Sequence, residues 1–142
     1  MGEAVSVAKP ELPLYRLYLL RVSYALIGVW QGLKTWPAIV HHTHSWDFWH
    51  GVGMSFLGAL TLLALLGIRY PVRMMPLLLF ELAWKLIWVL AAYLPPYLAR
   101  SVDPALANNF IGIFLGVVVV PLVLPWGYVW KNYVLAASDR WG

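Results

Sequence analysis

Two opposite charges lie one helical turn apart inside a long apolar stretch. Glu81 and Lys85 are the only charged residues within 76–98. A helix rises about 1.5 Å per residue, so this stretch is long enough to cross roughly 30 Å of hydrocarbon. A charge near the centre of such a helix costs about 2.5–3.5 kcal/mol on insertion scales. We therefore expect the pair to have buried partners or to form part of a binding or transport site.

A third charge, Arg21, lies in an earlier apolar stretch at a depth that should match that of Glu81. Arg21 shares a helical stripe with Gly28 and Gly32, and such small residues let another helix approach closely. We predict that Arg21, Glu81 and Lys85 meet in one interior cluster, with an ionised Glu81 touching at least one of the two bases. The other residues that could line this interior are Tyr18, Tyr24, Gln31, Ser55, Thr61, Trp84 and Trp88.

Three interpretations of this cluster remain open. Buried charges are usually paired, so the cluster could be a structural ion network. Because it contains one acid and two bases, a bound anion or a carbonyl of a quinone or lipid could meet the spare positive charge. Ionisable groups within a membrane also mark proton-coupled transporters and channels.

The four histidines form a second candidate site, because all of them fall within residues 41–50. If this segment is helical, His44, Asp47 and His50 lie three residues apart and share a face. Two imidazoles and a carboxylate suit Zn²⁺ or Cu²⁺. The alternative is an interfacial aromatic loop whose imidazoles meet water and lipid headgroups. A metal-dependent membrane enzyme that uses segment 41–50 is thus a further class of function.

No other catalytic machinery is visible in the sequence. No nucleophile–base set, phosphate-binding loop or complete metal motif can be assembled from these residues. We therefore do not expect a self-contained enzyme. The chain contains no cysteine, which excludes disulfides and thiolate chemistry.

The composition places the chain in a membrane. Hydrophobic residues make up 62% of the 142 residues and charged residues only 11%, against about 25% in soluble domains. The mean hydropathy is +0.73. Nine Trp and eight Tyr fit two belts of interfacial aromatic residues. The basic residues flank the apolar stretches instead of forming one patch, so we expect no nucleic-acid partner.

Four apolar stretches predict membrane-spanning helices at about 13–36, 48–68, 76–98 and 109–134. Short connections join them, and neither a linker nor an internal repeat separates parts of the chain. The sequence therefore predicts an all-α, polytopic membrane protein, with residues 1–142 forming a single four-helix transmembrane bundle. Pro121 and Pro125 predict a kink in the fourth helix.

Two segments carry a resemblance to a known family. Arg21, Gly28 and the closing Gly32-Leu33-Lys34 resemble the entry helix of the DoxX-like membrane proteins, and residues 57–73 resemble that family's second span and arginine-bearing turn. The resemblance implies a four-helix membrane fold. For some members of the family it implies quinone-dependent sulfur oxidation or thiol-redox complexes. His50 and Met54 occupy the region where the family usually has a glutamate.

These observations predict a small integral membrane protein of the bacterial inner membrane. It would be a binding or accessory subunit, alone as a homo-oligomer or within a larger membrane complex. Its ligand would be a quinone, a lipid or another hydrophobic molecule near the buried charges. One alternative is an oligomeric small-solute or proton-coupled transporter or channel. The other is the metal-dependent enzyme, with Zn or Cu bound by the loop within residues 41–50.

Charge asymmetry at the span ends predicts the orientation. Positive charge near a span marks the cytoplasmic side of a membrane. One side should hold Lys9, Arg16, Arg69, Arg73, Lys131 and Arg140, and the other only Lys34 and Arg100. We therefore expect both termini and the connection near residues 69–75 to be cytoplasmic.

Single cysteines introduced at Ser6, Ser101 and Ser138 of this cysteine-free chain test the orientation. An impermeant maleimide added outside intact cells should label position 101 only, because the other two positions should face the cytoplasm. Permeabilised cells, in which all three positions should react, are the control. External labelling at position 6 or 138, or protection at 101, would contradict the prediction.

Overall fold

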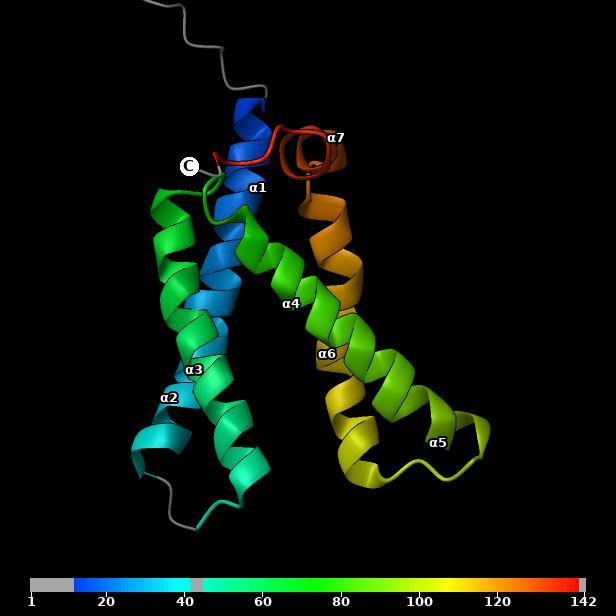
Figure 1. The fold of residues 1–142 in the computed structure, drawn as a ribbon. Helices are drawn as coiled ribbons and strands as arrows, with labels where there is room; N and C mark the ends of the chain where they lie inside the picture. The colour runs from blue at the N-terminus through cyan, green and yellow to red at the C-terminus, as the bar shows by residue number, and fades with distance from the viewer. Residues whose placement is uncertain (1–11, 42–44, 141–142) are drawn as a thin grey trace, which may run out of the picture.

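The computed structural model describes residues 12–41 and 45–140, and every regular element in this part of the chain is helical (Figure 1). The first helix runs without a break through α1 (Leu14–Ala25), the π-helical segment η1 (Leu26–Gln31) and α2 (Gly32–His41). Next comes α3 (Phe48–Arg69), and then a second composite helix of α4 (Met75–Ile87), η2 (Trp88–Tyr93) and α5 (Leu94–Leu98). The chain ends in α6 (Pro104–Val123), α7 (Trp126–Val129) and η3 (Trp130–Val134).

Three of these helices are long and apolar enough to cross a membrane, judged by length and composition. They are Phe48–Arg69, Met75–Leu98 and Pro104–Val123. The helices expected at 48–68 and 76–98 are thus confirmed, and the chain has the character of an integral membrane protein. The first helix has sufficient length, but Arg16, Arg21, Gln31 and Lys34 make it more polar than the other three. A four-span bundle remains a prediction.

The fourth helix differs from its expected bounds of 109–134. It begins earlier, at Pro104, where the Asp103 carboxylate caps it by accepting a hydrogen bond from the Ala105 backbone N–H at 2.9 Å. It ends at Val123, because Leu124 has an extended ψ of 128°. Pro125 disfavours the helical conformation at the residue before it. The expected kinked but continuous helix is therefore wrong: the chain breaks at Leu124, and α7 lies across the end of α6 (Figure 1).

This break leaves carbonyl groups in the last turn of α6 without backbone donors, and side chains satisfy them. The Trp126 indole N–H donates to the Pro121 carbonyl at 2.8 Å. The Arg16 guanidinium, from α1, donates to the carbonyls of Leu122 and Val123 at 3.1 and 3.2 Å. A cation at a helix C-terminus also complements the helix dipole. Arg16 therefore fixes the start of α1 against the end of α6.

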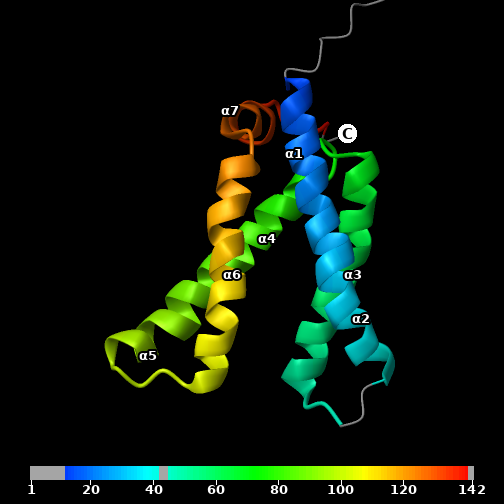
Figure 2. The same ribbon diagram turned by 180° about the vertical axis from the view of Figure 1, so that it is seen from behind.

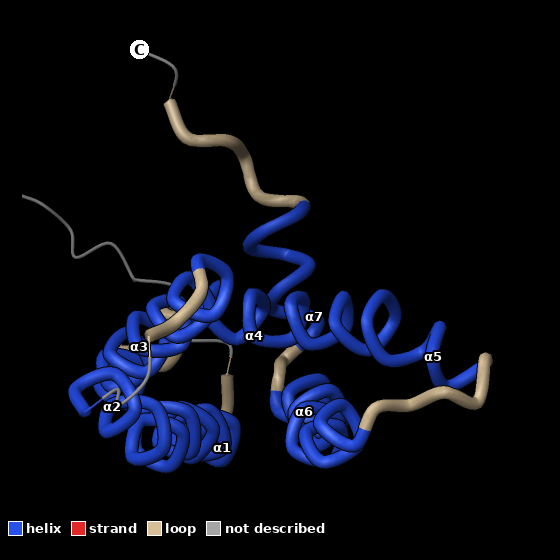
Figure 3. The backbone as a smooth tube through the Cα atoms, turned by 90° about the horizontal axis from the view of Figure 1, so that it is seen from below, coloured by secondary structure: helices blue, strands red, loops and turns tan. Residues whose placement is uncertain are grey.

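The helices form two hairpins that meet at one end. The first helix packs along α3, and the α4–η2 helix packs along α6 (Figures 1 and 2). At the closed end, which holds the turn between α3 and α4 and also α7, the hairpins contact each other. Toward the opposite, open end they diverge, as the view from below also shows (Figure 3). The fully buried side chains of the core include Leu20, Tyr24, Met75, Leu78 and Leu124.

Candidate functional site

A cavity of about 340 Å³ lies between the first helix, α4 and α6. Its walls are mostly apolar, and its polar lining residues are Ser23, Gln31, Glu81 and Lys85. The lining residues are Ser23, Leu26, Ile27, Trp30, Gln31, Glu81, Lys85, Gly112, Leu115, Gly116, Val119 and Val120. We call this space the Glu81 cavity.

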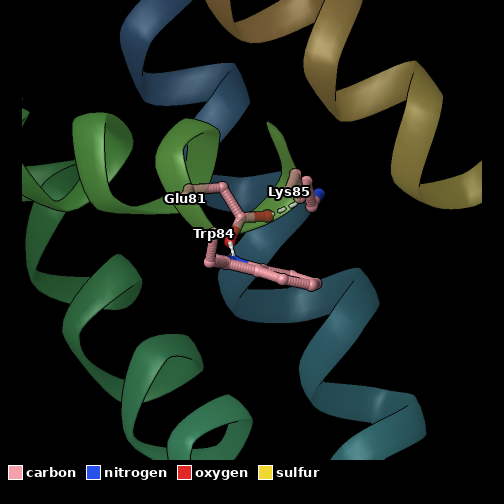
Figure 4. Close-up of polar contacts among 3 residues, drawn as sticks. All are labelled: Glu81, Trp84 and Lys85. Atoms are coloured by element: carbon pink, nitrogen blue, oxygen red, sulfur yellow. Dashed lines mark hydrogen bonds and ion pairs between the residues drawn. The ribbon is translucent and has the colours of Figure 1, made fainter. Parts of the chain in front are cut away.

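The predicted ion pair lies in the wall of this cavity. The Lys85 ammonium is 2.5 Å from Oε1 of Glu81, and the Trp84 indole N–H donates a hydrogen bond to Oε2 at 2.7 Å (Figure 4). Only 1% of the Glu81 side chain and 12% of the Lys85 side chain are exposed. The expected contact between Glu81 and one base is confirmed. Trp84, which the sequence analysis listed among the interior residues, contacts the Glu81 carboxylate but does not line this cavity.

Gly116 on α6 provides the space that Lys85 occupies. A Cβ atom added at Gly116 would collide with Nζ and with Cδ of Lys85. Gly112 lies one turn away on the same helix and also lines the cavity, but a Cβ there would meet no atom within 4 Å. The two glycines are therefore not equivalent: Gly116 is filled by the lysine side chain, while Gly112 faces open space.

The expected three-residue cluster is wrong for Arg21. The structure describes both Arg21 and Glu81, and no ion pair joins them. The Arg21 Nε–H instead donates to the Ile68 carbonyl at the C-terminal end of α3, at 3.0 Å, and the guanidinium lies 5.8 Å from the centre of the Tyr18 ring. Carbonyl groups at a helix end lack backbone donors and attract a cation. Arg21 therefore joins α1 to α3 and does not contribute to the cavity.

The other aromatic candidates also lie outside the cavity lining. Tyr24 is fully buried, and its hydroxyl donates to the Pro71 carbonyl at 2.8 Å. Its ring packs against Gly67, where a Cβ would collide with it. Trp88 stacks on Tyr93 with ring centres 6.0 Å apart. Tyr24 therefore joins α1 to α3 and to the turn that follows α3, whereas Trp88 and Tyr93 stack within one helical segment, η2.

Among the polar residues expected in the interior, Gln31 lines the cavity. Ser55 and Thr61 instead donate their hydroxyls to carbonyls of their own helix, at Gly51 and Gly58. Ser23 also lines the cavity and was missed. Ser23 and Ile27 lie four residues apart and therefore share one face of the first helix. A prediction based on this face, instead of the face that carries Arg21, would have identified Ser23.

Two π-helical segments flank the site. The segment η1 supplies four lining residues, and η2 begins three positions after Lys85. A π-helical insertion rotates the residues that follow it relative to a regular helix, and such insertions are frequent at functional sites. Here η1 contains Trp30 and Gln31, and both line the cavity.

A second cavity, of about 290 Å³, lies between α3 and α4. Apart from Gly53, its lining residues carry large apolar side chains: Phe56, Leu57, Leu60, Phe80 and Trp84. Trp84 thus lines the second cavity while its indole N–H binds the Glu81 carboxylate of the first. No charged side chain lines this second space.

The histidine site is only partly within the described residues. His44 lies outside them, so the proposed His44–Asp47–His50 metal site remains a prediction. Asp47 precedes the first residue of α3, and the His50 ring lies 5.3 Å from the ring of Trp46. Within residues 12–41 and 45–140, no group of three His, Cys, Asp or Glu side chains is placed to hold a metal ion.

In comparisons with known proteins, no family model, no curated protein and no solved structure matches this chain. The resemblance to DoxX-like proteins therefore remains an expectation from the sequence.

Double substitutions test whether Lys85 or Arg21 is the base that pairs with Glu81. Replacing Glu81 by Leu should strand the Lys85 charge, and breaking a buried pair typically costs about 3–5 kcal/mol. The melting temperature in detergent should fall sharply. Adding Lys85→Leu should restore part of the loss, because no unpaired charge then remains. Adding Arg21→Leu should lower stability further, and a rescue by Arg21→Leu would contradict the assignment.

Proposed function

We propose that this chain is a small integral membrane protein that binds an apolar ligand with a polar head group in the Glu81 cavity. The observation that carries the proposal is a buried ion pair in the wall of an otherwise apolar space between helices. Small-molecule sites are commonly apolar clefts of about 300–1,000 Å³ in which a few polar groups fix the ligand's orientation. The cavity, at about 340 Å³, has room for a ring-sized head group.

A quinone or a lipid fits this chemistry, because each combines a long apolar body with an oxygen-bearing head. The Lys85 ammonium can donate to a head-group oxygen, while Leu26, Leu115 and Val119 contact the apolar part. Such a site holds a ligand without transforming it. The role that follows is a binding or accessory subunit, in keeping with the DoxX-like resemblance of residues 21–34 and 57–73.

The proposed topology has four spans, with both termini in the cytoplasm of a bacterial cell and the helices in its inner membrane. The first helix would cross the membrane in addition to the three helices identified above. Support comes from the closed end, where the start of α1, the turn between α3 and α4, and α7 lie together (Figures 1 and 2). These elements carry Arg16, Arg69 and Arg73, whereas Lys34 and Arg100 lie toward the open end. Basic residues at one end fit the positive-inside rule.

Much of the apolar helix surface faces outward, which suits lipid or another membrane helix. Only 28%, 17% and 11% of the most apolar windows of Phe48–Arg69, Met75–Leu98 and Pro104–Val123 are buried inside the structure. We propose that lipid covers these faces and that part of them contacts a second copy or the subunits of a larger membrane complex.

A second candidate function is an oligomeric transporter or channel. The observation that favours it is the position of the ionisable Glu81–Lys85 pair on a cavity between membrane-type helices. In that case purified protein in liposomes would conduct ions or protons, and Glu81→Gln would block the flux. The binding function requires no flux.

Filling the cavity tests the binding function. Gly112 and Gly116 lie four residues apart on one helix face, so a side chain at position 112 should enter the cavity without touching Lys85. Native mass spectrometry of protein from mild detergent should show one retained apolar molecule per wild-type chain. The Gly112→Leu variant should lose it, because leucine occupies the space.

Two glycine variants serve as matched controls. A Cβ meets no atom within 4 Å at Gly53, in the second cavity, or at Gly51, which lines neither cavity. Gly53→Leu and Gly51→Leu should keep the retained molecule. A wild-type protein without any such molecule, or one that keeps it in Gly112→Leu, would contradict the proposed function.

A further inference from the structure

Two exposed arginines flank the turn between α3 and α4 at the closed end (Figure 1). Arg69 is the last residue of α3, and Arg73 lies in the turn, two positions before Met75 begins α4. The Cζ atoms of the two guanidinium groups lie 5.5 and 5.8 Å from the centre of the Tyr70 ring. Cation–π contacts with one ring therefore hold two positive charges near each other.

The backbone of this turn is fixed by side chains from other elements. The Tyr24 hydroxyl, from α1, donates to the Pro71 carbonyl at 2.8 Å, and the Tyr133 hydroxyl, from η3, donates to the Val72 carbonyl at 3.4 Å. Arg21 binds the end of α3, as described above. The carbonyl groups nearest to the two exposed guanidinium groups thus already have donors, and the turn is held in one position.

Neither exposed arginine has a negative partner within the part of the chain that the structure describes. No carboxylate there forms an ion pair with Arg69 or Arg73, and no group accepts a hydrogen bond from them. Arg16 and Arg21 differ, because both bind carbonyls at helix ends. Each free guanidinium offers five N–H donors in a planar fork that fits two phosphate oxygens. Since the two like charges repel, an anion that contacts both is favoured.

The position of the turn indicates which anion this is. One helix of membrane-spanning character ends at Arg69, and the next begins at Met75. When such helices cross a bilayer, the residues at their ends lie at the level of the lipid head groups. Tyr70 is 40% exposed and suits the same level, because tyrosine is enriched at membrane interfaces. Clusters of basic residues at the ends of membrane helices bind anionic head groups.

We propose that Arg69 and Arg73 form a binding site for the phosphate group of an anionic phospholipid, with Tyr70 orienting both guanidinium groups. Because Arg69 ends α3 and Arg73 precedes α4, the bound phosphate joins the two hairpins at the closed end. This site is separate from the Glu81 cavity, whose lining contains neither arginine. The proposal therefore does not depend on the binding function proposed above.

Two lipids with the same palmitoyl and oleoyl chains test the proposal: anionic phosphatidylglycerol and zwitterionic phosphatidylcholine. Each is titrated into the delipidated full-length chain in mild detergent, and native mass spectrometry measures the dissociation constant of the first bound lipid. The ionic strength is kept constant, because salt screens exposed charges. The wild-type protein should bind phosphatidylglycerol about tenfold more tightly than phosphatidylcholine.

Three double or single variants locate this preference. Arg69→Gln with Arg73→Gln should reduce the ratio of the two affinities to about one. Lys34→Gln with Arg100→Gln removes the same charge near the open end and should keep the wild-type ratio. Gly112→Leu, which fills the Glu81 cavity, should also keep it. A fourth variant, with lysine at both positions 69 and 73, keeps the charge but loses the planar fork, so its ratio should be intermediate.

Several results would overturn the proposal. Equal binding of the two lipids by the wild-type protein would do so, as would an undiminished preference in a folded chain with glutamine at positions 69 and 73. The same loss in the Lys34→Gln, Arg100→Gln control would show that only net charge matters. If the glutamine variant does not fold, the wild-type ratio and the lysine variant decide, and an undiminished ratio in the lysine variant would contradict a phosphate site built on the guanidinium groups.

Discussion

The contact between Glu81 and Lys85 is the constraint on which the rest of the site depends. An unpaired charge inside an apolar helix costs free energy, so Glu81 and Lys85 must remain in contact in the folded protein. Their separation of four residues on α4 places them side by side whatever the other helices do. What the other helices must provide is space and hydrogen bonds. Gly116 supplies the space for the ammonium, and Trp84 supplies a donor for one carboxylate oxygen.

Three cationic side chains on the helices find negative partners in two ways. Lys85 has an acid within reach on its own helix, while Arg16 and Arg21 bind carbonyl groups at the C-terminal ends of α6 and α3. Carbonyls at helix ends carry partial negative charge and lack backbone donors, so they can serve a guanidinium almost as an acid would. Both arginines lie on α1: Arg16 joins this helix to α6 in the other hairpin, and Arg21 joins it to α3 in its own hairpin.

Much of the helix pattern could be predicted from the sequence because it depends on local composition. The apolar stretches at 48–68 and 76–98 gave helices close to their observed bounds. The Glu81–Lys85 contact was also predictable, since it requires only the spacing of four residues along one helix. In contrast, the direction in which Arg21 points depends on how the first helix is rotated about its own axis. The depth of a residue in the membrane does not determine that rotation. The missed role of Gly116 has the same origin: the helix that faces Lys85 could not be known.

The end of α6 was mispredicted for a different reason. Two prolines four residues apart are compatible with either a kink or a break, and the outcome depends on whether the freed carbonyls find other donors. Trp126 and Arg16 provide them, and Arg16 is more than a hundred positions away in the chain. Local sequence cannot show such a donor. The same limit applies to the Glu81 cavity, which residues from three separate helices line.

The most direct test of the account is the identity of the cation that contacts Glu81. Solid-state NMR of the isotope-labelled protein in lipid bilayers can detect through-space correlations between the Glu81 carboxyl carbon and side-chain nitrogens. The structure predicts a strong correlation with Nζ of Lys85, a second with the indole nitrogen of Trp84, and none with Arg21. A correlation between Glu81 and the Arg21 guanidinium, with none to Lys85, would contradict the account.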